Sequence, residues 1–327
     1  MKPSKTQIGR SDNLEDFVPT TKQYAALQRI CLTDFGHWLV GEGMEASLST
    51  MVQAPLLLVF LLRAYGLRLY KAGAPLYTYI YVLTAIQRFE PLIKPVMTVA
   101  WQVAWDWRQL EPTCHRMPMP MAIFKAMISL ALQLNWTRFA GVTIIAFRGP
   151  GRIGEVLQAL RKALVLPVDN LNEHTDRTFL NVIKPKTANR GGARVQHLTI
   201  RGTDNAKVLS ASFSSLQGHE LLYPFTPATY RARWDALLKM LKVPRASGFT
   251  PGGLRGGGAV ALYTADAPIA DIMWRMRVRS QDTLAHYLQE VTAAFSRRNL
   301  PGEARENVSA AAATYDMAMS TVGQFGL

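Results

Sequence analysis

Apolar residues recur at three- and four-residue intervals through most of the first 110 positions, the spacing of amphipathic helices. The first periodic run begins at Thr20 or Thr21, either of which can cap a helix, and it ends at Gly41. Further helices are predicted over 49–70, 76–89 and 94–110. A polar leader, residues 1–19, precedes them. We therefore expect residues 20–110 to form an all-helical domain.

The rest of the chain mixes helical and strand-like patterns. Residues 111–120 hold three prolines without periodicity and are predicted to link two domains. Helical spacing resumes after this linker and again from Thr226. Between these helical parts, residues 178–200 place apolar arms around a polar, Gly-rich middle, which is typical of a β-hairpin. The pattern predicts a mainly helical fold with a small hairpin or sheet, in which a mixed α+β domain over 121–300 precedes a C-terminal helix or tail at 301–327.

The charge balance points to a polyanionic partner. The 327 residues include 37 Lys and Arg against 23 Asp and Glu, a net charge of +14, while 49% of the residues are hydrophobic. Such a composition indicates a folded basic protein and not a disordered tail. Nucleic acid is the first candidate, because lysines and arginines release counterions from phosphates. The plainer interpretation is that the charge only keeps the protein soluble.

The cysteines and the apolar stretches restrict the compartment. Cys31 and Cys114 are too few for a disulfide framework, and no Cys/His cluster has the spacing of a zinc site, so we expect no metal. The longest uncharged apolar stretch, 54–62, is far shorter than the roughly 20 residues of a membrane span. These features predict an intracellular protein without a membrane partner, in the nucleus of a eukaryote or the cytoplasm and nucleoid of a prokaryote.

A glycine motif follows the apolar run over 139–147. Gly149, Gly151 and Gly154 have the GxGxxG spacing of a dinucleotide-binding turn, and Asp169 lies 20 residues after Gly149. That motif needs alternating strands and helices around it, whereas the surrounding pattern is mainly helical. An NAD(P)-dependent oxidoreductase with its site at 149–154 therefore stays open as an alternative.

A second set of residues overlaps this motif. Arg152 opens a helix directly after the glycine turn, with Glu155 one turn later. Lys186 lies in the Gly-rich middle of the predicted hairpin. Arg255 is followed by three consecutive glycines, which imply that another segment approaches the backbone closely. Tyr287 comes 32 residues after Arg255.

An arginine, a hairpin lysine, a second arginine and a tyrosine, in this order, resemble the catalytic domain of tyrosine recombinases, the phage-integrase family. The resemblance covers about residues 120–290, and the N-terminal helices resemble the core-binding domain that precedes it. It implies a protein of DNA recombination or integration, of the kind that mobile elements carry. Its implied partners are double-stranded DNA and further copies of the chain, as a homo-tetramer on DNA. It implies no metal and no cofactor.

The resemblance also implies a role for each matching residue. Arg152 and Arg255 would hold the phosphate, since guanidinium groups match phosphate oxygens bidentately. Lys186 would protonate the leaving 5′-oxygen as the general acid. Tyr287 would be the nucleophile that forms a 3′-phosphotyrosyl link. Glu155 would orient Arg152 or its neighbours.

The chain departs from the family pattern at two positions. Gly252 stands where the family has a histidine, three residues before Arg255. Val278 stands where the family has a histidine or tryptophan, nine residues before Tyr287. His286 is a nearby substitute by sequence, although adjacent helical positions point in different directions. A catalytically inactive DNA-binding relative is therefore an open alternative, as is a helical scaffold whose charge is incidental.

Other basic residues of the second domain are candidates for contacts with DNA phosphates. They lie in the predicted hairpin and before Tyr287, at Lys184, Arg190, Arg194, Arg275, Arg277 and Arg279.

Overall fold

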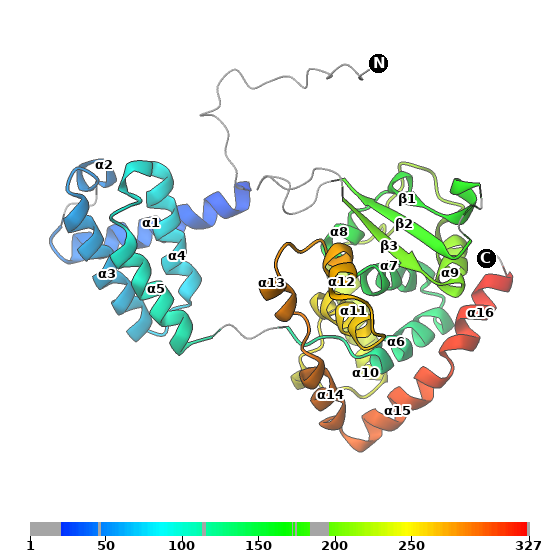
Figure 1. Cartoon of the computed structure of the whole chain (residues 1–327). Coiled ribbons are helices and arrows are strands. Elements are labelled where there is room, and N and C mark those ends of the chain that lie inside the picture. The colour runs from blue at the N-terminus through cyan, green and yellow to red at the C-terminus, as the bar shows by residue number, and fades with distance from the viewer. Residues whose placement is uncertain are drawn as a thin grey trace, which may run out of the picture. The chain divides into compact units, whose positions relative to one another are not determined.

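A computed structural model describes the chain over residues 21–44, 47–112, 116–171, 173, 175–183 and 196–325. The chain divides into two compact units, Met1–Cys114 and His115–Leu327 (Figure 1). The polar leader lies outside the described residues. So do the middle of the predicted linker and the middle of the predicted hairpin.

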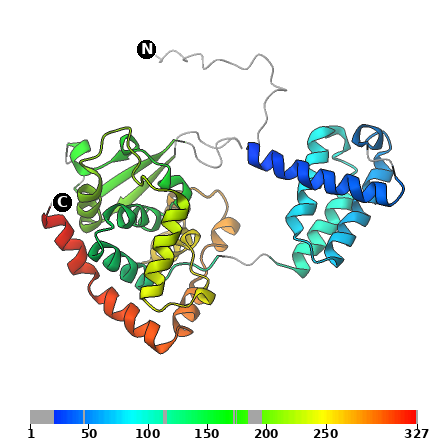
Figure 2. The ribbon, with the colours of Figure 1, turned by 180° about the vertical axis from the view of Figure 1, so that it is seen from behind.

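The first unit is helical. Its helices are α1 (Lys22–Gly41), α2 (Leu48–Met51), α3 (Pro55–Lys71), α4 (Leu76–Phe89) and α5 (Thr98–Leu110). Thr21 caps α1, because its side chain accepts a hydrogen bond from the Tyr24 amide. α1 packs on α4 and α3 packs on α5, and Figure 2 shows α1 lying across the other helices of this unit. The buried core includes Phe35, Leu62 and Trp107.

Two predicted boundaries in this unit were wrong. The single helix expected over 49–70 is divided into α2 and α3, because Pro55 lacks the amide hydrogen that a continuous helix needs and begins a new one. The helix expected from residue 94 begins only at Thr98, after turns that contain Pro95.

The second unit surrounds a small sheet with helices. Its elements up to the sheet and the helix after it are α6 (Met121–Gln133), α7 (Thr137–Arg148), α8 (Ile153–Leu157), β1 (Leu164–Val165), β2 (Arg177–Val182), β3 (Gln196–Arg201) and α9 (Thr203–Phe213). The later helices are α10 (Pro227–Met240), α11 (Leu254–Tyr263), α12 (Ile269–Met276), α13 (Gln281–Ala285), α14 (Glu290–Arg298), α15 (Gly302–Ala313) and α16 (Tyr315–Phe325). The prediction of a mainly helical fold with a small sheet is confirmed.

The sheet is antiparallel throughout, in the order β1-β2-β3. β2 and β3 are the arms of the predicted hairpin, with Thr178 opposite Ile200 and Val182 opposite Gln196. α7 and α9 pack against this sheet. β1 was not predicted, because two residues are too few to show a strand period.

The last two helices belong to the core of their own chain. α15 packs on α6, and α16 packs on both α6 and α9, as the red and orange helices along the edge of this unit show in Figure 1. Ala304, Val308, Tyr315 and Met319 are buried in this contact. The C-terminal segment expected as a helix or tail is therefore helical and docked.

The glycines after Arg255 allow two other segments to approach α11. A Cβ atom on Gly257 would collide with the carbonyl oxygen of Met119, and one on Gly258 would collide with the carbonyl oxygen of Phe147. These glycines lie inside the helix, where glycine is otherwise unfavourable. The expected close approach is thus made by the protein's own backbone.

The dinucleotide-binding interpretation of residues 149–154 is wrong. The apolar run before Gly149 is helix α7, whereas that site needs a strand there. A Cβ on Gly151 would collide with the side chain of Leu198, so this glycine lets β3 pack against the turn. Asp169 accepts a hydrogen bond from Arg161 at 2.9 Å.

In the part of the chain that the structure describes, no helix has both the length and the apolar character needed to cross a membrane.

We predict that Gly257→Ala lowers the free energy of unfolding by about 2–3 kcal/mol, because the new methyl group must displace a backbone carbonyl. Gly154→Ala is the matched control, since nothing lies within 4 Å of a Cβ built there. We expect it to leave stability unchanged or to raise it by about 0.5–1 kcal/mol. Urea unfolding measures both, and equal effects of the two substitutions would contradict the packing argument.

Candidate active site

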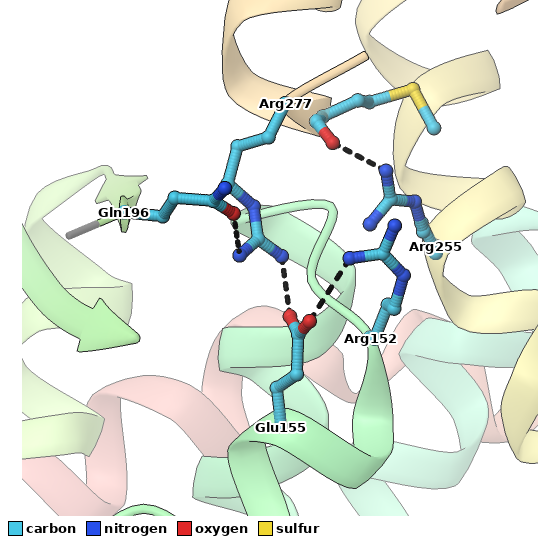
Figure 3. Close-up of polar contacts among 6 residues, drawn as sticks. Arg152, Glu155, Gln196, Arg255 and Arg277 are labelled. Carbon is cyan, nitrogen blue, oxygen red and sulfur yellow. Dashed lines mark hydrogen bonds and ion pairs between the residues drawn. The ribbon is translucent and has the colours of Figure 1, made fainter. Parts of the chain in front are cut away.

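Arg152 and Glu155 lie at the start of α8, directly after the turn of Gly149 and Gly151. Arg152 is the residue before the first helical turn and has extended backbone angles, so its side chain leaves the helix end. Its Nη1 donates a hydrogen bond of 2.9 Å to Oε1 of Glu155, one turn further along (Figure 3). Glu155 therefore holds the guanidinium of Arg152 in place.

Arg277 binds the other oxygen of the same carboxylate. It ends α12 in the left-handed region, with φ of 57°. Its Nη2 donates to Oε2 of Glu155 at 2.5 Å, and its Nη1 donates to Oε1 of Gln196 at 3.0 Å. The side chains of Arg277 and Glu155 are only 8% and 9% exposed. This network joins α8, β3 and α12.

Arg255 is the most deeply buried arginine of the site, with 4% of its surface exposed. Its Nη2 donates to the carbonyl oxygen of Met276. Among the described residues, its Nε and Nη1 have no hydrogen-bond partner. Burial and the positive charge of Arg152 lower the pKa of Arg255 to about 10. An anion that reached Arg255 would satisfy these groups and relieve this repulsion.

The site holds more positive than negative charge. In Figure 3 the guanidinium groups of Arg152 and Arg255 lie side by side, and Glu155 is the single acidic side chain drawn there. Burial alone would raise the pKa of Glu155, but the hydrogen bonds and charges of Arg277 and Arg152 outweigh it, so this pKa lies below its ordinary value. One carboxylate thus faces three arginines, an arrangement that favours a phosphate.

Tyr287 contacts Arg255. The guanidinium carbon of Arg255 is 5.3 Å from the centre of the Tyr287 ring, within the range of a cation–π contact. Ser280 caps α13 by accepting from the Thr283 amide, and the Tyr287 amide donates to the Leu284 carbonyl just after this helix. This turn after α13 packs the half-buried side chain of Tyr287 in the same apolar cluster as Leu284.

The structure thus brings together four of the residues chosen from the sequence, namely Arg152, Glu155, Arg255 and Tyr287. Val278 packs in the small apolar cluster of α11–α13, and His286 is exposed next to Tyr287. Gly252 lies one turn before Arg255, in the short 3₁₀ helix Pro251–Gly253.

The basic residues before Tyr287 differ in their surroundings. Arg275 forms an ion pair of 2.9 Å with Asp271, and its side chain is 9% exposed. Arg279 is exposed, as is Trp274. Arg277 was grouped with them as a DNA contact, but its buried hydrogen bonds place it in the network of Glu155. The hairpin residues Lys184, Lys186, Arg190 and Arg194 lie outside the described residues.

Gln196 and the position of Arg277 were missed by the sequence analysis. Nothing in the order of residues marks a glutamine at the start of a strand, because its role depends on a side chain 81 positions away. Arg277 was likewise not marked as a partner of Glu155, since the sequence shows neither the burial of Glu155 nor the contact between residues 122 positions apart.

Comparisons with known proteins show the fold. The structure is similar to the Tn1549 transposon integrase (residues 82–397), solved in complex with circular intermediate DNA, with a TM-score of 0.50 and 13% identity over 72% of this chain and 84% of that chain. It is also similar to XerA recombinase, with a TM-score of 0.41 and 14% identity over 83% and 98% of the two chains. No protein-family model and no curated protein sequence matches the chain. At this identity the similarity to the integrase supports the tyrosine-recombinase resemblance at the level of the fold.

We predict that Arg277→Gln lowers the free energy of unfolding by about 3 kcal/mol, because it removes one partner of a buried ion pair. Arg279→Gln changes an exposed arginine two residues away and serves as the control, with an expected effect within about 0.5 kcal/mol. Urea unfolding distinguishes the two. Equal, small effects would mean that Arg277 does not hold Glu155.

Glu155 also predicts a pH dependence. Because its pKa is lower in the folded protein than its ordinary value of 4.5, its stabilising contribution is complete above that value and is lost as the pH falls through the lowered pKa. The difference in unfolding free energy between the wild type and Glu155→Gln should therefore shrink as the pH falls from about 6 to about 3. Glu306→Gln, at an exposed site, is the control and should give a constant difference.

Proposed function

We propose that this protein binds double-stranded DNA and cleaves and rejoins one strand through a 3′-phosphotyrosyl link on Tyr287. The observation that carries the proposal is the buried guanidinium of Arg255, which lies against the Tyr287 ring and beside Arg152 with two nitrogens unpartnered among the described residues. The similar fold of an integrase solved with DNA and the net charge of +14 support it.

In the proposed step, Oη of Tyr287 attacks the phosphorus of a DNA phosphodiester. The bond from phosphorus to the tyrosine oxygen forms as the bond to the 5′-oxygen breaks, and Lys186 gives its proton to that oxygen. The phenol proton passes to water. The released 5′-hydroxyl of a second strand reverses the step, so no net oxidation or hydrolysis takes place.

The arginines stabilise the charge that develops on the phosphate oxygens. Fixed donors in a site with little water lower such a barrier more than mobile ones, because they need no reorganisation during the reaction. Arg255 is fixed by its bond to the Met276 carbonyl, and Arg152 by Glu155. Arg277 and Glu155 are positioning residues in this proposal, since they act through Arg152.

Lys186 belongs to the segment between β2 and β3. The last described pair of these strands is Val182 and Gln196, and Gln196 hydrogen-bonds Arg277. The strand ends that carry this segment therefore meet the site, which supports a hairpin lysine as the acid. Lys184, Arg190 and Arg194 would contact neighbouring phosphates, as would Arg275 and Arg279. The proposal includes a homo-tetramer on two DNA sites and an intracellular location, in the nucleus or nucleoid.

A catalytically inactive DNA-binding relative is the second candidate. Gly252 and Val278 favour it, because neither can hydrogen-bond a phosphate or transfer a proton through a side chain. The loss of one acid–base group typically lowers a rate by about 10²–10⁴-fold.

We predict that the wild type forms a covalent adduct on nicked duplexes taken from DNA that flanks its own gene, and that Tyr287→Phe forms none, because only the phenol oxygen can attack. Tyr263→Phe is the control, since Tyr263 is an exposed tyrosine of α11. Denaturing gels detect the adduct. If both the wild type and Tyr287→Phe bind DNA with a steep dependence on salt and neither is trapped, the inactive relative is correct.

A further inference from the structure

The space where a side chain of residue 252 would lie is filled by Arg116. A Cβ atom built on Gly252 would collide with Nη1 of Arg116, and the Cδ and Cζ atoms of the same side chain lie 2.9 and 3.0 Å from it. The end of the Arg116 side chain therefore lies where the first side-chain atom of residue 252 would be. Gly252 does not have a positive φ, so an ordinary residue could adopt its backbone conformation. A side chain at this position would have to displace Arg116.

The segment that carries Arg116 is held in place by its own backbone. The amide of Met119 donates to the carbonyl oxygen of Gly253 at 3.1 Å. A Cβ on Gly253 would collide with the carbonyl oxygen of Met117, and a Cβ on Gly257 would collide with that of Met119. Residues 117–119 thus run along the start of α11 in direct contact, and this fixes the point from which Arg116 extends.

This position brings Arg116 close to the proposed phosphate site. Residues 252 and 255 are three apart across the 3₁₀ turn and the first turn of α11, so a Cβ at residue 252 would lie on the same face as that of Arg255, about 5–6 Å away. Arg116 is exposed, whereas Arg255 is buried on the same face. The exposed guanidinium of Arg116 is therefore accessible to a phosphate of DNA.

We infer that Arg116 is a further catalytic residue, which donates to the scissile phosphate from the place of the histidine that residue 252 lacks. The inference rests on the proposed function. A guanidinium can donate hydrogen bonds to a phosphate oxygen, as a histidine does, but it stays charged and cannot transfer a proton. Arg116 thus supplies the hydrogen bonds and the positive charge that the histidine would give to the phosphate, and other groups must transfer the proton.

The test exchanges the two side chains. Arg116→Ala should slow adduct formation on the nicked duplexes about 10²–10³-fold, the usual effect of removing one preorganised donor. Adding Gly252→His to Arg116→Ala should restore at least about tenfold, because the histidine then enters the vacated space. Arg305→Ala, on the exposed surface of α15, is the control and should react as the wild type does. Thermal unfolding checks that each variant is folded.

The outcomes separate this inference from the proposed function. If the wild type forms an adduct and folded Arg116→Ala reacts within twofold of it, Arg116 is not a catalytic residue and the proposed function stands. If the wild type forms no adduct, the proposed strand transfer fails. The role of Arg116 is then tested by measuring how the binding of duplex DNA depends on salt in the wild type and in Arg116→Ala. A contact to phosphate predicts that Arg116→Ala reduces the salt slope by about 1, and an unchanged slope overturns it.

Discussion

The geometry of the site depends on one buried carboxylate. Glu155 binds Arg152 through one oxygen and Arg277 through the other, and Arg277 continues to Gln196. These contacts tie the start of α8 to the end of α12 and to the first residue of β3. Without this carboxylate, Arg152 and Arg277 would repel each other, and the buried side chain of Arg277 would lose a partner that offsets its desolvation. The position of Arg152, to which the proposed function assigns a phosphate contact, therefore depends on a residue that would not touch the phosphate.

Close approach of backbone segments is the second constraint. Gly253, Gly257 and Gly258 let residues 117–119 and the end of α7 pack directly on α11. The helix that carries the buried Arg255 is therefore held against these two segments. The same contact also brings a distant part of the sequence, Arg116, to the edge of the same site. The glycines thus shape the site through packing, while Arg255 between them is the residue that would bind a ligand.

The features that depend on residues near one another in the chain could be predicted from the sequence. The hydrophobic period, the helix caps and the hairpin pattern predicted most of the helices and strands. The order of Arg152, Arg255 and Tyr287 pointed to residues that the structure brings together. Contacts between distant segments could not be predicted, because the pairing of Arg277 with Glu155 depends on 122 intervening residues. The same limit explains the error at Gly149 and Gly151. Their spacing fits a nucleotide-binding turn, but only the helical state of α7 and the packing of Leu198 show their role.

The surroundings of Arg255 favour the binding of an anion. Arg255 is buried with two nitrogens unpartnered in the described part of the chain, next to Arg152, which carries the same charge. The rest of the second unit keeps this arrangement folded through its large apolar core. A phosphate that satisfies those nitrogens would gain hydrogen bonds without any movement of the arginines, because their positions are already fixed. Since such a ligand binds the folded chain alone, its binding must also stabilise the fold. In the proposed function, affinity for a phosphodiester and resistance to unfolding are therefore linked through the buried guanidinium of Arg255.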